Sequence, residues 1–457
     1  MRAILLACIA AAAVTVRLAG AAGTRAPEVD VSNLPGPQTN PTIAVDPVND
    51  QILLAGSNSL LEGTQRIYSS TDGGATWQTA VTFPPPRSVR TSCSADPGVA
   101  IDRRGRQYYS FVRSSPCRSD GVYRVYIETR PDATSRWSPP RTIAPLGRAR
   151  LDDKPAIAAD TSPVSRYRNR VYVAWTRLSR TIVASIVISH SDDSGRTWSR
   201  PVKVNRIGSQ LTYASIGVSR SGIVYVAWTD VENFGISIAR SSDGGNHFGP
   251  EQKVAAFPVI PIPHCGMGIV IPAEPRSCIQ ANPSISVDTS GGRYSGRVYV
   301  SYTAADIRGD HGATLTIFDS KLRAVSGYPI KRGSGILFPQ PLERPADQFW
   351  TQSAVDPSNG ALWVCYYDTH GDPTRTKVHY SCTVSRDGGK RWARQVRAAS
   401  VASDETQKGA SYQYGYYQGL AVANGLAHPI WTDTRRLKTL GEEIYTTRLT
   451  ADDFAKR

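Results

Sequence analysis

After its first 22 residues, the sequence contains no apolar run long enough to cross a bilayer. It also lacks Cys-x-x-Cys pairs and any cysteine and histidine cluster with metal-ligand spacing. Its 53 Lys and Arg residues outnumber its 38 Asp and Glu residues, but they are spread along the chain without a dense basic run. These absences argue against a membrane span, a metal or other cofactor, and a nucleic-acid partner.

The first 22 residues have the features of an export signal. Arg2 precedes an apolar run from Ala3 to Val16, and Ala19-Gly20-Ala21 has the small residues of a cleavage site. We therefore expect residues 1–22 to be a signal peptide and the protein to be secreted, into either the medium or a periplasm.

Cysteine is scarce, with seven residues in 457, and Cys8 would leave with the signal. The remaining six are an even number, which favours disulfides in an exported protein. Proximity in the sequence suggests the pairs Cys93 with Cys117, Cys265 with Cys278, and Cys365 with Cys382.

One eight-residue pattern recurs in the chain, with Ser first, Asp third, Gly fifth and an aromatic residue eighth. The copies cover residues 70–77, 191–198, 241–248 and 385–392. Ser and Asp side chains can accept hydrogen bonds from nearby backbone N–H groups, Gly allows positive φ, and the aromatic ring can pack under the next strand. The pattern therefore indicates a turn, not a catalytic group.

These units resemble the Asp box, or BNR repeat, of sialidases and other secreted β-propellers. Four copies, each after a β-rich run, imply an all-β propeller of four-stranded antiparallel blades. The same motif occurs in sialidases, in xyloglucan-cleaving hydrolases and in proteins without known chemistry. It is therefore a strong guide to fold and a poor guide to activity.

Seven strand-rich units follow one another along the chain. The seventh has no outer strand, whereas residues 28–32 have no unit of their own. We therefore expect one domain over residues 28–450 with seven blades, closed by an N-terminal strand added to the last blade. Six blades, as in sialidases, are the alternative, because the fifth unit has lost its box.

The connections of such a meander emerge on two faces, with the box turns on one of them. The opposite face carries the long segments 255–280, 331–347 and 397–416, and long loops on a rigid scaffold are the usual place for binding and catalysis. Alternatively, they only cover the propeller. Residues entering the inner strands should ring the central channel on this face, namely Asn40, Asp96, Asp153, Lys154, Tyr213, Asn282, Asp347, Trp350 and Tyr417.

The resemblance to sialidases implies a tyrosine nucleophile, an acid/base aspartate and three arginines that bind a sugar carboxylate. The family's Phe/Tyr-Arg-Ile-Pro signature is absent, since Gly36-Pro37-Gln38-Thr39-Asn40-Pro41 stands near the first blade. Tyr417 is the candidate nucleophile, and Asp153 and Asp347 are the candidate pair for a two-carboxylate scheme. The candidate substrate-binding residues are Asp96, Lys154, Tyr213, Trp350, Asp433 and Arg435. Asp433 also fits a turn cap after its strand.

We expect a monomer that acts on an extracellular glycan or glycoconjugate as an exo-acting glycoside hydrolase. The alternative is a non-catalytic propeller that uses the same ring to bind a glycan or a protein. A closed pocket with carboxyl groups of shifted pKa would favour the enzyme, and a flat, aromatic-lined face would favour the binding protein.

Overall fold

The computed structural model describes residues 26–82, 93–117, 121–145, 147, 149–181, 183–256, 269–305, 311–325, 346–410 and 414–454. Within these residues the regular elements are β-strands and one short 3₁₀ turn, η1 (Ala451–Phe454). No helix in this part of the chain is long and apolar enough to cross a membrane. The proposed signal peptide lies outside the described residues.

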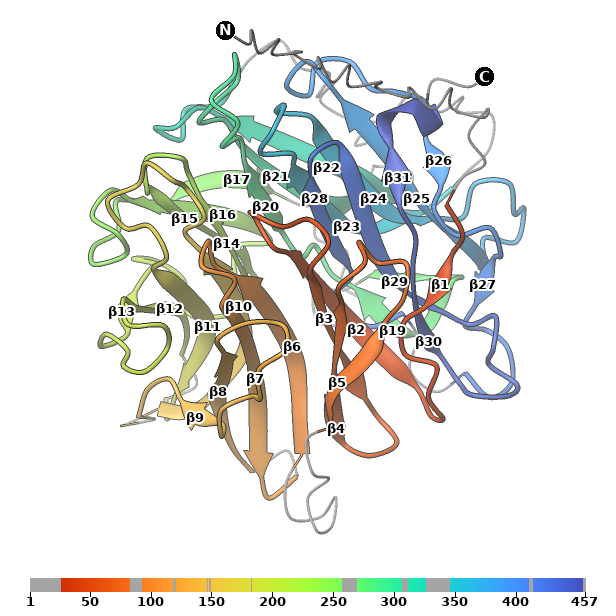
Figure 1. The fold of residues 1–457 in the computed structure, drawn as a ribbon, viewed down its shortest axis with the longest axis horizontal. Helices are drawn as coiled ribbons and strands as arrows, with labels where there is room; N and C mark the ends of the chain where they lie inside the picture. Colours follow the sequence, from red (N-terminus) through yellow and green to blue (C-terminus); the bar gives the residue numbers. More distant parts are fainter. Residues whose placement is uncertain are drawn as a thin grey trace, which may run out of the picture.

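The strands form antiparallel blades arranged in a ring (Figure 1). Blade 1 contains β2 (Gln38–Val45), β3 (Leu53–Ser59), β4 (Thr64–Ser70) and β5 (Gln78–Thr82). Blade 2 contains β6 (Cys93–Ile101), β7 (Gln107–Ser115), β8 (Val122–Arg130) and β9 (Arg141–Thr142). Blade 3 contains β10 (Ala149–Ala159), β11 (Val171–Ser179), β12 (Ala184–Ser191) and β13 (Val202–Lys203). Blade 4 contains β14 (Leu211–Val218), β15 (Val224–Asp230), β16 (Gly235–Ser241) and β17 (Gln252–Ala256).

The remaining blades are less regular. Blade 5 contains β20 (Ser284–Val287), β21 (Val298–Ala305) and β22 (His311–Phe318), with a single bridge from Phe318 to Ala324 in place of an outer strand. Blade 6 contains β23 (Gln348–Val355), β24 (Leu362–Asp368), β25 (Lys377–Ser385) and β26 (Val396–Arg397), and β27 (Ser403–Asp404) also pairs with β25. Blade 7 contains β28 (Gly419–Ala423), β29 (Leu426–Asp433), β30 (Glu443–Thr446) and β31 (Leu449–Thr450). A hairpin of β18 (Ile269–Ile271) and β19 (Glu274–Ile279) precedes blade 5.

The ring closes with seven blades. Each inner strand contacts the next, in the order β2, β6, β10, β14, β20, β23, β28, and β28 contacts β2 again. The N-terminal strand β1 (Val29–Asp30) pairs with β30 through Val29 and Thr446, so an N-terminal strand completes blade 7 (Figure 1). The seven-bladed prediction and its N-terminal closure are confirmed, and the six-bladed alternative is wrong.

The four Ser-Asp turns have nearly identical geometry. In the first, Ser70 Oγ accepts a hydrogen bond from the Gly74 N–H at 2.9 Å and donates to Asp72 Oδ1 at 2.8 Å. Asp72 Oδ1 accepts the Thr76 N–H at 2.9 Å, and Gly74 has a φ of 81°. Every bond closes within four residues, which explains why a short sequence pattern predicts the turn.

Two of the predicted disulfides are present. Cys93 is bonded to Cys117, and Cys365 is bonded to Cys382 at directly opposed positions of β24 and β25. Cys278 is also disulfide-bonded, but its predicted partner Cys265 lies outside the described residues.

Candidate functional site at the channel mouth

Strand register separates the two faces of the propeller. In blade 1, Val45 at the end of the inner strand lies opposite Leu53, and Leu53 lies opposite the box residue Ser70. Asn40 stands near the start of that inner strand, at the other end of the blade. The box turns and the inner-strand entries therefore lie on opposite faces, as the meander argument requires.

The inner strands enter the channel through a repeated irregularity. Five non-glycine residues at this place have a left-handed backbone: Asn40 (φ 54°), Asp96 (φ 57°), Lys154 (φ 52°), Tyr213 (φ 53°) and Trp350 (φ 52°). Each coincides with a shift in strand register. A left-handed non-glycine residue costs about 1–2 kcal/mol, and β-bulges commonly redirect a side chain beside a functional site. We call these five residues, together with Asn282 at the entry of blade 5, the channel ring.

The polar side of the channel ring is one connected network. Asn40 Nδ2 donates to Asp96 Oδ1 at 3.3 Å, and Lys154 Nζ lies 3.8 Å from Asp96 Oδ2. The same ammonium lies 4.8 Å from the centre of the Tyr213 ring and 5.1 Å from that of Tyr416. The residues predicted separately for blades 1 to 4 are therefore brought together in space.

The aromatic side of the mouth is built from Tyr416 and Tyr417, which follow a long loop. Their ring centres lie 6.0 and 5.9 Å from that of Tyr213, and Trp350 lies 6.0 Å from Tyr416. Asn40 Oδ1 accepts the Tyr416 N–H at 2.8 Å, which fixes this segment on blade 1. Tyr416 was not among the predicted site residues, although the tyrosine-rich segment 412–417 was a signal for it.

Gly415 allows the tyrosine segment to lie against the ring. It has a φ of 79°, and a Cβ atom there would lie 2.0 Å from Asn40 Oδ1. Any other residue at this position would displace Tyr416 from Asn40.

Burial governs the ionisation of the polar network. It raises the pKa of Asp96, with Lys154 opposing the shift and the charge of Asp153 adding to it. Burial lowers the pKa of Lys154, but the charge of Asp96 and the other charges around it together raise it by more, so the Lys154 pKa lies well above its usual value. Burial is the largest cause of the raised pKa of Tyr417, and the charge of Asp96 is the second cause. Asp153 is half-buried, and its carboxylate has no hydrogen bond or ion pair to another described residue.

A small cavity lies just inside the ring. Its volume is about 190 Å³, and residues in or just before the inner strands of all seven blades line it, including Pro41, Tyr213, Gln352 and Tyr417. Sites for small molecules usually measure about 300–1,000 Å³. The cavity is therefore smaller than a typical small-molecule site.

Trp350 lies beneath the hairpin β18–β19. Its side chain is 3% exposed, and its Nε1 donates to Glu274 Oε1 at 3.2 Å. Burial raises the pKa of Glu274 to about 8. Part of the predicted segment 255–280 therefore covers the channel face, and direct contact of Trp350 with a substrate would require the hairpin to move.

Asp347 is fully buried and paired. Its Oδ1 lies 2.8 Å from His311 Nδ1, its Oδ2 accepts from Arg375 Nε at 2.8 Å, and Arg375 Nη2 completes a bidentate contact. Although burial opposes ionisation, the bonds to His311 and Arg375 hold the Asp347 pKa below its usual value. No contact joins it to Asp153 among the described residues, so the structure does not bring the predicted carboxylate pair together.

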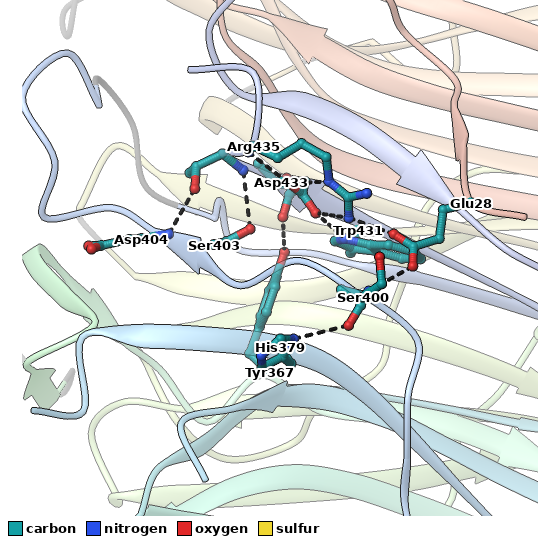
Figure 2. Close-up of polar contacts among 12 residues, drawn as sticks. Glu28, Tyr367, His379, Ser400, Ser403, Asp404, Trp431, Asp433 and Arg435 are labelled. Atoms are coloured by element: carbon teal, nitrogen blue, oxygen red, sulfur yellow. Dashed lines mark hydrogen bonds and ion pairs between the residues drawn. The ribbon is translucent and has the colours of Figure 1, made fainter. Parts of the chain in front are cut away.

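Asp433 and Arg435 belong to the closure of blade 7. Arg435 donates to both carboxylate oxygens of Asp433, at 2.9 and 2.7 Å, and lies 2.6 Å from Glu28 of the N-terminal segment. Figure 2 shows Arg435 between these two acids, with Trp431 beside Asp433. Neither residue contacts the channel ring among the described residues. Their role in substrate binding stays a prediction that no ring contact supports.

The described residues contain no group of three or more potential metal ligands.

Structural comparison places the fold among propellers that include sialidases. The chain is similar to the Hadza microbial sialidase Hz136, with a TM-score of 0.51, 12% identity, and coverage of 93% of this chain and 69% of that one. It is also similar to the NanB sialidase of Streptococcus pneumoniae, with a TM-score of 0.50, 10% identity, and coverage of 80% and 70%. At these identities the similarity establishes the fold alone.

Sequence comparison gives a weaker relationship. A xyloglucanase of Hypocrea jecorina (strain QM6a) is 21% identical over 248 residues, which cover 50% of this chain. The chain spans only about a quarter of that relative's length, because the match covers 27% of it. No family model matches the sequence.

Proposed function

We propose that this protein is an exported Asp-box propeller whose channel mouth acts on an extracellular glycan as a glycoside hydrolase. The observation that carries the proposal is the joining of Asp96, Lys154 and Tyr213 from three blades beside Tyr417. Five left-handed residues at one place would cost folding energy without such a function, and strain of this kind concentrates at active sites. The sialidases and the xyloglucanase that the chain resembles support a glycan as the substrate class.

In this scheme, Tyr417 is the nucleophile. Its hydroxyl oxygen bonds to the anomeric carbon of the sugar as the glycosidic bond breaks, and water later displaces the tyrosine. One carboxyl group must accept the phenol proton while another protonates the leaving oxygen. The half-buried Asp153 suits the base. Asp96 suits the acid in the protonated state that its raised pKa favours, in which it no longer forms an ion pair with Lys154. Asp347, which the sequence pairs with Asp153 in a separate two-carboxylate scheme, is not used here because its carboxylate is occupied by His311 and Arg375.

A non-catalytic glycan-binding propeller is the second candidate, and the size of the cavity favours it. A cavity of about 190 Å³ is below the usual range for small-molecule sites, which favours a ligand that lies across the mouth against Tyr213 and Tyr416. The arginines near this face also have partners already. For example, Arg177 Nε donates to Asp152 at 2.7 Å, and Arg435 is held by Asp433.

Hydrolysis of a panel of aryl glycosides, including a sialoside, tests the proposal. We expect turnover by the full-length secreted protein and a loss of at least a hundredfold in kcat in Tyr417→Phe and in Asp153→Asn. Tyr167→Phe, which alters a tyrosine on the box face, should retain activity. Binding on a glycan array without turnover of any glycoside would overturn the hydrolase and support the binding protein. The absence of both turnover and binding would overturn both candidate functions.

A further inference from the structure

A groove of about 780 Å³ lies between blades 1 and 2 on the box face, opposite the channel ring. One wall is the box turn of blade 1, which includes Ser70 and Thr76, and the other is residues 133–139 of blade 2. Its volume is within the usual range for small-molecule sites, about 300–1,000 Å³. We call it the blade 1–2 groove.

The turn of blade 2 departs from the box pattern in a coordinated way. In blade 2, Arg130 lies opposite Gln107 in the neighbouring strand, and in blade 1 Ser70 lies opposite Leu53 at the same position. Arginine therefore replaces the box serine, and glutamine replaces an apolar residue. Asp132 still accepts backbone N–H groups, from Thr134 at 2.8 Å and from Ser135 at 2.9 Å. The turn therefore persists, while the interior beneath it has become polar.

Arg130 fastens this polar interior to the neighbouring blade. Its Nε and Nη2 donate to Gln107 Oε1 at 2.8 and 2.6 Å, and Nη2 also donates to Ser69 Oγ of blade 1 at 3.0 Å. The guanidinium carbon lies 4.8 Å from the centre of the Trp137 ring. Arg130 thus positions Trp137, which lines the groove.

Glu128 lines the same groove, and its side chain has no partner among the residues that the structure describes. It is two residues before Arg130 on β8, so the two side chains leave the same face of the strand, and Glu128 is only 3% exposed. No hydrogen bond or ion pair joins its carboxyl group to any other residue that the structure describes. Burial alone raises its pKa to about 8.

The carboxyl oxygens of Glu128 are not among the fully enclosed unpartnered atoms, so they are open to the groove that Glu128 lines. Desolvation of this mostly buried acid is costly unless a molecule in the groove hydrogen-bonds to it. The residues two places before the four box serines are Tyr68, Ser189, Ala239 and Thr383, none of them acidic. The acid is therefore specific to blade 2. A ligand that hydrogen-bonds to Glu128 in the groove would remove this cost.

The lining of the groove selects among ligand classes. Arg130 and Arg136 both line it, which disfavours a cation, and the guanidinium of Arg130 is already engaged by Gln107 and Ser69. The exposed walls contain many hydroxyl groups, including those of Thr71 and Thr79. Hydroxyls, a buried acid and an indole ring match the alternating hydrogen-bonding edges and apolar faces of a sugar.

We propose that the blade 1–2 groove binds a neutral saccharide unit, with the carboxyl group of Glu128 hydrogen-bonded to its hydroxyls and Trp137 against its ring. This is a binding site on the face opposite the proposed catalytic mouth. It does not depend on the proposed function.

Calorimetric titration with neutral tetrasaccharides of glucose, xylose and mannose tests the proposal, with tetragalacturonate and the glucosamine tetramer as charged probes. We expect binding of at least one neutral probe and at least tenfold weaker binding in Glu128→Ala and in Trp137→Ala. Glu128→Gln keeps a donor and an acceptor and should bind within threefold of the wild type. Thr79→Trp fills the exposed wall without changing the interior, and should block binding in a protein that still folds.

Two matched variants separate this groove from other parts of the protein. Trp198→Ala alters the corresponding tryptophan of an intact box, and Tyr167→Phe alters a tyrosine elsewhere on the box face, so both should leave the affinity unchanged. Loss of binding in Tyr417→Phe but not in Thr79→Trp would overturn the proposal by placing the ligand at the mouth. Binding of charged probes only, no binding of any probe, or loss of binding in Glu128→Gln would also overturn it.

Discussion

The ammonium group of Lys154 lies 4.8 Å from the centre of the Tyr213 ring, and the two residues occupy the same left-handed position in neighbouring blades. Neither residue could reach the other from a regular strand on its own blade, where side chains alternate between the two faces of the sheet. The repeated bulge turns each side chain toward the channel mouth. A propeller built of similar blades thereby gathers different side chains, one from each blade, at a single place.

The backbone at Lys154 should be strained, and glycine should relieve that strain. We expect Lys154→Gly to be more stable than Lys154→Ala by about 1 kcal/mol, because both remove the ammonium but only glycine adopts a φ of 52° freely. Urea unfolding of the two variants measures the difference.

Lys253 is the matched control. It is an exposed residue in β17, and it is absent from the left-handed non-glycine residues of the described chain. Here Lys253→Gly should be less stable than Lys253→Ala by about 0.5–1 kcal/mol, since glycine weakens a strand. The same order of stability at both positions would contradict strain at Lys154.

The closure of the ring should depend on Arg435. Its removal leaves the buried Asp433 and Glu28 without their cation, so Arg435→Ala should lower the free energy of unfolding by about 3–5 kcal/mol. Arg436, its neighbour, pairs with Asp30 at 3.0 Å from a side chain that is 39% exposed. Arg436→Ala should cost about 1 kcal/mol or less. Equal losses in the two variants, measured by chemical unfolding, would show that the network in Figure 2 does not hold the blade closed.

The disulfide between Cys365 and Cys382 should stabilise blade 6. It links residues 17 apart in the sequence, and closing a loop of about 15 residues is worth about 3 kcal/mol. We expect the double variant Cys365→Ala/Cys382→Ala to lose about that much in urea unfolding. A double variant as stable as the wild type would mean that β24 and β25 are already fixed by their backbone pairing.

The sequence predicts the blades well because the interactions that define them are local. Ser70 and Asp72 form their hydrogen bonds within their own turn. Residues 28–32 are the one strand-like segment outside the seven units, and the seventh unit is the one without an outer strand, which predicts their pairing. The ring positions were predictable for a similar reason, since each stands where an inner strand begins.

The partners of the site residues were not predictable, because they come from distant parts of the chain. Nothing in the sequence around Asp347 indicates that His311 and Arg375 occupy its carboxylate. Arg435 and Glu28 meet only because the ring closes on the N-terminal segment. The sequence therefore predicts substrate contacts for side chains of a suitable chemical type on the channel face, whereas the fold pairs these side chains with other residues of the protein.

Stability should fall as pH rises, because several buried acids hold their protons in the folded state. The pKa of Glu274 is raised from 4.5 to about 8, chiefly by burial. Between those two values the folded protein binds more protons than the unfolded chain, so this group stabilises the folded state less as pH rises from 4.5 to 8. Glu128 and Glu443, whose pKa values are also raised to about 8, should act in the same direction.

Glu274→Gln isolates one of these groups. The amide oxygen can still accept the hydrogen bond from Trp350 Nε1, but the residue no longer titrates. At pH 5, where Glu274 is protonated in the folded protein, we expect the variant and the wild type to have similar free energies of unfolding. At pH 8.5 the variant should be more stable by at least about 1.4 kcal/mol, the equivalent of one pKa unit. Urea unfolding at both pH values measures this, and a difference that does not grow with pH would mean that Glu274 is already ionised beneath the hairpin.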